Sequence, residues 1–384
     1  MDRSLSVLLV TEASSAGVGR HLLDLADGLA RSGQRVEVAY SPIRSEAAFL
    51  ERLESLDVRA TRIPMRRMPH PQDWAARGAL KQLLASRGPF DVLHLHSTKA
   101  GLLGRTLGRA TGSAAVLYTP HCLYTMNPDL GALGRRMIGG MERWLAPRTD
   151  ALVAVSPDEE QHAREQGLRP KTLCTIPNGV GPIELEPDAR GALGLPPGAP
   201  VLGFIGRLSS QKNPIQLLEV FAQLRRDLPQ LQLAVAGTGP MQNEARDHAR
   251  QLGLGQDVHW LGHQSPARLL AAIDVLCMPS RYEGMPYVLL ETGAAGVPVV
   301  VTPVGGSRLC VENEVNGTIT DDFTTASIAA AAKRWLDDEA ARDRVRAGVP
   351  AFLDKFGLDP MVQSTLELYR RLAAGKHPEP AVAS

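Results

Sequence analysis

Two acidic residues, Glu283 and Glu291, stand eight positions apart in the stretch of sequence that offers the most chemistry. Glu283 follows an apolar run, residues 274–279, that predicts a buried strand and its exit. Gly284 then loosens the backbone, and Pro286 suits the first position of a helix. We therefore expect Glu283 in the loop ahead of a helix and Glu291 about two turns inside that helix.

The start of this predicted helix is also a candidate anion site. The first amides of a helix have no partner within the helix, and the helix dipole favours a negative charge there. Here those amides belong to Met285, Tyr287 and Val288. Carboxylates accept hydrogen bonds from hydroxyl groups, whereas free amides bind phosphate. The combination fits a ligand that carries both groups, and a nucleotide sugar is such a ligand.

Two cations follow another predicted strand, Val201–Ile205, in the sequence Gly206-Arg207-Leu-Ser-Ser-Gln-Lys212. An arginine can bind two phosphate oxygens at once, and a lysine adds a point charge. Each charged hydrogen bond of this kind contributes about 1.5–3 kcal/mol. From the spacing alone, two solvated loop cations are the alternative to a phosphate site.

Glycines follow several of the predicted strands. Gly237 and Gly239 come after residues 231–236, and Gly305 with Gly306 follows the apolar run 296–302. Glycine lets a ligand approach the backbone, but a tight turn explains the same residues equally well.

The N-terminal half carries a weaker glycine motif. Gly17 and Gly19 join the first predicted strand to the first helix, but the third glycine of a G-x-G-x-x-G motif is missing. Tyr40 and Ser41 stand where a dinucleotide-binding dehydrogenase has an acidic residue. The pattern disfavours a dehydrogenase and leaves room for a loop that faces a pyrophosphate.

His96 and His121 each follow a strand of the first half. A histidine at a strand end is often a structural hydrogen-bond partner, but two at one sheet edge raise the odds of a functional role. The sequence contains no clustered metal-ligand spacing, and nothing in it requires a metal.

These residues depend on an alternation of strands and helices that predicts parallel α/β sheets. The expected strands are residues 6–10, 35–39, 58–63, 91–95, 114–119, 151–155, 172–176, 201–205, 231–236, 258–261, 275–277 and 299–302. The expected helices are residues 18–31, 73–86, 100–110, 132–146, 157–166, 214–227, 241–252 and 360–373.

A loose stretch near residues 180–187 interrupts this alternation and predicts a domain linker. We expect a first domain over residues 1–183, joined by the terminal helix at about 358–375, and a second domain over 188–357. Ligands of such sheets bind at the carboxyl ends of the strands, so the expected site is a cleft between the domains. Residues 376–384 are expected to form a loose tail.

Composition excludes several classes of protein. The 384 residues carry a formal net charge of +1, which disfavours nucleic-acid binding, and no apolar run approaches the roughly 18 residues of a membrane span. The four cysteines have no metal-binding spacing, so we expect reduced thiols in a cytoplasmic protein.

Together, these motifs resemble the family-4 retaining glycosyltransferases, which have the GT-B fold of two Rossmann-like domains facing a cleft. The two glutamates match the family's E-x7-E signature, and residues 206–212 match its Gly-Arg-Leu-x-x-x-Lys element. Residues 176–180, 296–306 and the region of His121 also match. The resemblance spans about residues 5–370, and it implies that the C-terminal helix crosses back to the first domain.

The resemblance implies a role for each site residue. Arg207 and Lys212 would hold the donor diphosphate, Glu283 would contact the donor sugar, and His121 would lie near that sugar and assist the reaction. Glu291 would bond the ribose hydroxyls. The implied donor-binding residues are Gly17, Gly206, Gly237, Gly239, Gly284, Met285, Pro286, Tyr287 and Glu291. Family members transfer with retention and usually without a metal or other cofactor.

Residues 96–105 are similar to bacterial members that build O-antigen, capsule or exopolysaccharide, which commonly use a UDP-sugar and a lipid-linked acceptor at the inner membrane face. Arg59, Arg62, Arg66 and Arg67, with Met65 and Met68 between them, could contact anionic lipid there. A solvated basic loop is the alternative to this peripheral attachment.

Two other functions share the architecture or the motifs. A nucleotide-sugar 2-epimerase has the same two-domain fold, although the two glutamates with the Arg-x4-Lys pattern favour transfer. A binding subunit with a silent site is the other alternative, and the intact set of charged residues argues against it.

Overall fold

A computed structural model describes residues 3–14, 16–107, 112 and 114–375 of the chain. The expected tail, residues 376–384, lies outside the described residues. The chain divides into two compact units. The N-terminal unit contains residues 1–179 together with 358–384, and the C-terminal unit contains residues 180–357.

The N-terminal unit is built on a parallel sheet of seven strands in the order β3-β2-β1-β4-β5-β6-β7. These strands are β1 Ser6–Thr11, β2 Arg35–Tyr40, β3 Arg59–Arg62, β4 Val92–His96, β5 Ala115–Thr119, β6 Ala151–Ala154 and β7 Thr172–Thr175. Its helices are α1 Ala16–Arg31, α2 Ala47–Ser55, α3 Asp73–Arg87, α4 Ser97–Arg105, α5 Ala132–Leu145, α6 Pro157–Glu165 and α16 Leu358–Ala374, with 3-10 turns η1 Pro42–Arg44, η3 Tyr124–Met126 and η4 Ala146–Arg148.

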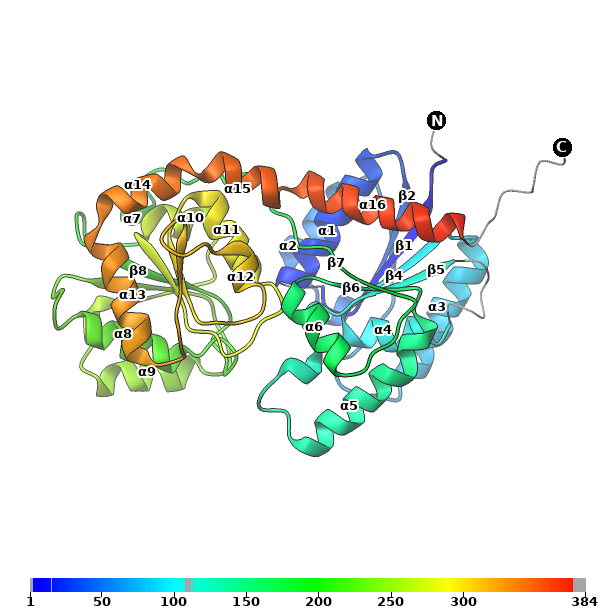
Figure 1. Cartoon of the computed structure of the whole chain (residues 1–384), viewed down its shortest axis with the longest axis horizontal. Helices are drawn as coiled ribbons and strands as arrows, with labels where there is room; N and C mark the ends of the chain where they lie inside the picture. The colour runs from blue at the N-terminus through cyan, green and yellow to red at the C-terminus, as the bar shows by residue number, and fades with distance from the viewer. Residues whose placement is uncertain (1–2, 15, 108–111, 113, 376–384) are drawn as a thin grey trace. The chain divides into compact units, whose positions relative to one another are not determined.

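The terminal helix α16 belongs to this N-terminal unit, where it lies along α1 (Figure 1). The contact is close because α1 has a glycine at the crossing: a Cβ on Gly28 would lie 2.3 Å from the Val362 side chain. Tyr369 is fully buried in the same core, and its hydroxyl bonds His94 Nδ1 at 2.6 Å. The expectation that the last helix returns to the first domain is confirmed.

The C-terminal unit has a parallel sheet of six strands in the order β10-β9-β8-β11-β12-β13. They are β8 Val201–Ile205, β9 Gln232–Ala236, β10 Val258–Gly262, β11 Val275–Met278, β12 Val299–Val301 and β13 Gly317–Ile319. Its helices are α7 Ala189–Ala192, α8 Pro214–Leu224, α9 Gln242–Gln251, α10 Pro266–Ala272, α11 Tyr287–Ala295, α12 Ser307–Cys310, α13 Thr325–Asp337, α14 Glu339–Ala347 and α15 Val349–Phe356, with the turn η5 Gly255–Asp257.

The expected strands are confirmed. Central strands such as β1 and β4 are buried along their whole length and therefore read as short apolar runs, whereas the edge strand β3 is mostly exposed and polar. The first residues of the helices agree less well with the expected ones. The helix expected at residues 100–110 begins earlier, at Ser97, and residues 108–110 lie outside the described residues. The helices α2, α7, α10 and α12–α15 and the strand β13 were not expected.

The boundary between the units falls a few residues before the expected one. We expected the first domain to reach residue 183, whereas the second unit begins at Val180. The Val180 amide donates to the Phe356 carbonyl at 2.9 Å, so both ends of the C-terminal unit are joined to each other at this point.

Candidate functional site

The predicted donor residues of the C-terminal unit lie in loops that follow its strands and in the helix α11. Strand β8 is the centre of this sheet, with β9 on one side and β11 on the other. The strand order therefore reverses at β8, and ligands of open α/β sheets bind at such a point, beyond the carboxyl ends of the strands. The loops that follow β8, β9 and β11 carry Arg207, Gly237 and Glu283.

Glu283 and Lys212 form an ion pair in this group of loops. Lys212 Nζ lies 2.7 Å from Glu283 Oε1, and both side chains are largely buried, at 17% and 8% exposure. The Gln211 side-chain amide donates to Glu283 Oε2 and to the Tyr282 carbonyl, each at 3.1 Å. The carboxylate is therefore held in one position and its charge is compensated within the protein.

Backbone and hydroxyl bonds join the same two loops. The Arg281 amide donates to the Gln211 carbonyl at 2.8 Å, and Arg281 Nη1 donates to Ser210 Oγ at 2.9 Å. The loop after β8 and the loop after β11 thus form one unit. A ligand that contacts one of them is also positioned by the other.

The glycine pair that follows β12 supports Glu283 from another side. A Cβ on Gly305 would lie 2.3 Å from the Glu283 carbonyl oxygen. Gly306 has a φ of +75°, and a Cβ there would lie 2.9 Å from the Gly284 carbonyl oxygen. Larger residues would displace the loop, so both glycines set the position of Glu283.

Gly237 and Gly239 also have a packing function. A Cβ on Gly237 would lie 2.0 Å from the Gly206 carbonyl oxygen, and one on Gly239 would lie 2.2 Å from that of Leu208. The Leu208 amide donates to the Thr238 carbonyl at 3.0 Å. The backbone of another loop of the chain therefore approaches both glycines closely. Their contact with a donor stays a prediction.

Helix α11 begins one residue later than the sequence predicted. Pro286 is the residue that precedes the helix, and Tyr287 is its first residue. Glu291 is consequently in the second turn of the helix and not two full turns inside it. The side chain of Glu291 is buried, as are those of Met285 and Tyr287. The first amides of such a helix remain the natural place for an anion.

Arg207 differs from the other charged residues of these loops. Its side chain is exposed, and it forms no ion pair with any residue that the structure describes. Lys212 is already paired with Glu283. Arg207 can therefore bind phosphate without first breaking an ion pair.

In the N-terminal unit, three histidines come together beside the predicted Gly17. The sequence placed Gly17 in a loop, but α1 begins at Ala16, so Gly17 is in the first turn of the helix. His21 follows one turn later. His96 ends β4, His121 follows β5, and His96 Nδ1 lies 3.1 Å from His121 Nε2. His21 was missed, although its spacing of four from Gly17 places both on one helix face.

Burial keeps these histidines neutral. Desolvation lowers the pKa of His21 to about 4, against a weaker opposing effect of a hydrogen bond to Asn178. Desolvation also lowers the pKa values of His96 and His121 well below the ordinary value, and the neighbouring histidines lower them further. His121 has a φ of +57°, a conformation that costs energy and is common at functional sites.

The segment 96–105 has a structural function in this unit. Lys99 Nζ bonds Asp73 Oδ2 at 2.5 Å, and both partners are largely buried. Arg105 is fully buried, pairs with Glu142 at 2.9 Å, and lies 3.9 Å from the centre of the Tyr118 ring. Their charges are satisfied inside the fold.

The arginines of the basic segment 59–67 are exposed. Of the two methionines that were expected to contact lipid with them, Met65 is 2% exposed and packs in the core, so that expectation is wrong for Met65, whereas Met68 is 69% exposed. Helix α5 presents a second apolar surface, formed by Leu133, Met137 and Trp144, which are 73%, 66% and 53% exposed. Every helix within the described residues is too short or too polar to cross a lipid bilayer.

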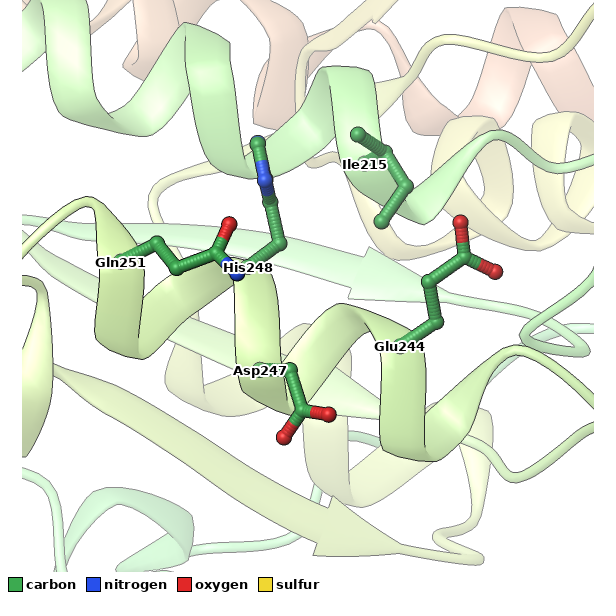
Figure 2. A pocket seen from close by; sticks show the side chains of 5 residues that line it. All are labelled: Ile215, Glu244, Asp247, His248 and Gln251. Carbon is green, nitrogen blue, oxygen red and sulfur yellow. The ribbon is translucent and has the colours of Figure 1, made fainter.

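A hollow of about 500 Å³ lies at α8 and α9, and it contains none of the predicted site residues (Figure 2). Its lining residues are Ile215, Glu244, Asp247, His248 and Gln251. It is a polar surface depression, and its lining residue Ile215 is at the start of α8, directly after the loop that carries Arg207.

Comparisons with known proteins agree with this arrangement. A family model described as glycosyl transferases group 1 matches residues 186–349, and one described as a glycosyl transferase 4-like domain matches residues 16–179. A D-inositol 3-phosphate glycosyltransferase 1 of Catenulispora acidiphila is 30% identical over 320 residues, which are 78% of this chain and 76% of that protein. The chain belongs to the group 1 glycosyl transferases.

The match of residues 16–179 to the glycosyl transferase 4-like domain places this glycosyltransferase with the family-4 enzymes, and a further relative is also a glycosyltransferase. An Escherichia coli protein named UDP-Gal:alpha-D-GlcNAc-diphosphoundecaprenol alpha-1,3-galactosyltransferase is 26% identical over 76% of this chain and 78% of that protein. The resemblance to the family-4 enzymes is therefore confirmed, and the chain is a transferase by family.

Solved structures confirm the GT-B fold of this transferase. A sucrose-phosphate synthase of Thermosynechococcus elongatus aligns with a TM-score of 0.81 and 22% identity, over 97% of this chain and 100% of that one. The Anabaena protein Alr3699/HepE, in complex with UDP and glucose, aligns with a TM-score of 0.80 and 20% identity, over 95% and 99%.

Proposed function

We propose that this transferase moves a sugar from a UDP-sugar to a hydroxyl of a lipid-linked saccharide, with retention and without a metal ion. The observation that carries the proposal is the joined pair of loops in the C-terminal unit, where Glu283 is fixed by Lys212 and Gln211 beside the exposed Arg207. The preference for uridine rests on one relative whose name contains UDP and on one similar structure that was solved in complex with UDP.

Each residue of these loops has a role in the proposal. Arg207 binds the diphosphate with its planar donors, and the amides at the start of α11 bind it from a second direction. Glu291 accepts hydrogen bonds from the ribose hydroxyls. Glu283 accepts hydrogen bonds from hydroxyls of the donor sugar, and its pairing with Lys212 brings a positive charge to the same place.

The reaction needs stabilisation of the departing charge more than it needs a nucleophile in the protein. The anomeric carbon loses its bond to the phosphate oxygen and gains one to the acceptor oxygen on the same face, and the acceptor proton passes to the departing phosphate. Positive groups that are already in position stabilise the charge that develops on that phosphate. His121 lies near the donor sugar in this proposal.

The proposed acceptor carries a lipid, so the protein would work at a membrane surface. The apolar surface of α5 is accompanied by the exposed basic residues Arg136 and Arg143 on the same helix, and this composition suits an anionic lipid interface. The exposed Arg66 and Arg67 would add charge to the contact.

The proposal is tested by transfer from UDP-sugars to a polyprenyl diphosphate saccharide in the presence of EDTA, with the product analysed by NMR. We expect the anomeric configuration of the donor in the product and unchanged turnover with EDTA. Arg207→Ala should lower kcat by about 100-fold or more, because it removes one transition-state donor. Arg226→Ala is the matched control, since this arginine is exposed at the end of α8.

Three results would contradict the proposal: an inverted product, loss of turnover with EDTA, or equal rates in the two arginine variants. Conversion of a UDP-sugar to an epimer without any acceptor would favour the epimerase instead.

A further inference from the structure

Three imidazole rings of the N-terminal unit are arranged around one point. His21 on α1, His96 at the end of β4 and His121 after β5 each offer one nitrogen, and these three nitrogens lie within 4.8 Å of one another. The ring centres are 4.7, 5.3 and 5.4 Å apart. Three imidazoles that bind one tetrahedral ion at about 2.0–2.1 Å would have ring centres about 5 Å apart, close to the distances observed.

Two of these rings have hydrogen-bonding capacity that the protein leaves unused. Among the described residues, Nδ1 of His21 and Nε2 of His96 are buried and have no hydrogen-bond partner. His21 is 4% exposed and His96 is fully buried. Buried polar atoms are nearly always satisfied. His96 faces His121 through Nδ1, so an ion between these two rings leaves His96 Nε2 unchanged, and the unsatisfied Nδ1 of His21 is the atom that indicates a missing partner.

Histidine is the commonest protein ligand of transition metals, and it binds them through the lone pair of an unprotonated ring nitrogen. Neutral nitrogen ligands suit zinc, copper and nickel, whereas magnesium and calcium prefer oxygen.

A buried carboxylate holds the loop of one of these rings in place. The carboxylate of Glu159 accepts the amides of Cys122 and Leu123 at 2.7 and 2.8 Å, and thereby fixes the loop that carries His121. Partners of this kind orient the histidines of metal sites.

We propose that His21, His96 and His121 bind one transition-metal ion of the Zn²⁺ class. The ion replaces the proton that His96 and His121 share, and three protein ligands leave one tetrahedral position for an oxygen ligand. The transfer reaction proposed above proceeds without this ion, and the ion is held by the N-terminal unit alone. Binding is therefore tested independently of catalysis.

The test uses full-length, tag-free protein that has been stripped with a chelator. Zn²⁺ affinity is measured by competition with a chromophoric chelator, and the bound ion is examined by X-ray absorption. We expect one equivalent of Zn²⁺ with three imidazole ligands. His21→Gln and His96→Gln should each weaken binding by more than about 100-fold, because the loss of a ligand costs more than the loss of a supporting residue.

His94→Gln is the matched control. His94 is also buried, but its Nδ1 bonds Tyr369 and its Nε2 bonds Thr119, so it is not a ligand and its loss should leave Zn²⁺ affinity unchanged. Thermal unfolding of each variant identifies any variant that fails to fold. The X-ray absorption spectrum of the wild type counts the imidazole ligands without the use of any variant. The proposal is overturned if the wild type binds no stoichiometric Zn²⁺, if fewer than three imidazoles surround it, or if folded ligand variants retain wild-type affinity.

Discussion

The buried ion pair of Lys212 and Glu283 makes a prediction at the scale of single residues. Lys212→Met would leave the Glu283 carboxylate in a largely buried position with only Gln211 as a side-chain partner. An uncompensated buried charge is costly, so we expect the free energy of unfolding of the C-terminal unit to fall by about 2–3 kcal/mol. Urea denaturation measures the change.

The control for this variant is another lysine in an ion pair. Lys333 pairs with Asp337 on the exposed face of α13, at 38% and 48% exposure. Lys333→Met should cost less than about 0.5 kcal/mol, because exposed pairs contribute little. Equal effects of the two substitutions would show that the Lys212 pair is not a structural part of the site.

At the scale of elements, Gly305 couples one loop to another. Gly305→Ala would place a methyl group 2.3 Å from the Glu283 carbonyl oxygen, so the loop after β11 has to move. We expect weaker donor binding, by about tenfold or more, since a small misplacement of site groups has large effects. The change is measured by titration with UDP.

Gly191→Ala provides the comparison, because a Cβ at Gly191 would meet no atom within 4 Å. This variant should bind UDP as the wild type does. Wild-type affinity in Gly305→Ala as well would mean that the position of Glu283 is not set by the glycine pair.

Helix α5 gives a second prediction at this scale. A Leu133→Glu and Met137→Glu double variant replaces two of the three apolar residues on the surface of the helix without touching the core, since both side chains are exposed. Less protein should then sediment with anionic liposomes, and an Arg66→Glu and Arg67→Glu variant should show a smaller loss. Liposome binding that is the same in wild type and both variants would refute the membrane contact.

The sequence predicted the strands and the residues at their ends because parallel strands leave a clear apolar signal. It could not predict what lies beside those residues. Gln211 contacts Glu283 across about seventy positions of sequence, and Gly305 supports the same residue from a third loop. His21 was missed for a similar reason, since its neighbours His96 and His121 come from two other strands. Contacts between distant segments have no periodicity to reveal them.

At the scale of the whole molecule, the residues with proposed roles belong to two compact units. The C-terminal unit alone carries Arg207, Lys212, Glu283 and Glu291, so nucleotide binding should depend on this unit. The N-terminal unit carries the histidine cluster. It also carries the exposed surface of α5, which the proposal connects with the lipid-linked acceptor.

Nucleotide binding by the C-terminal unit is the central claim, and calorimetric titration of the full-length protein with UDP, GDP and ADP in the presence of EDTA tests it most directly. The account predicts that UDP binds most tightly, that Glu291→Ala weakens UDP binding, and that Glu244→Ala, a change at an exposed residue of α9, does not. Absence of UDP binding, or the same UDP affinity in both glutamate variants, would contradict it.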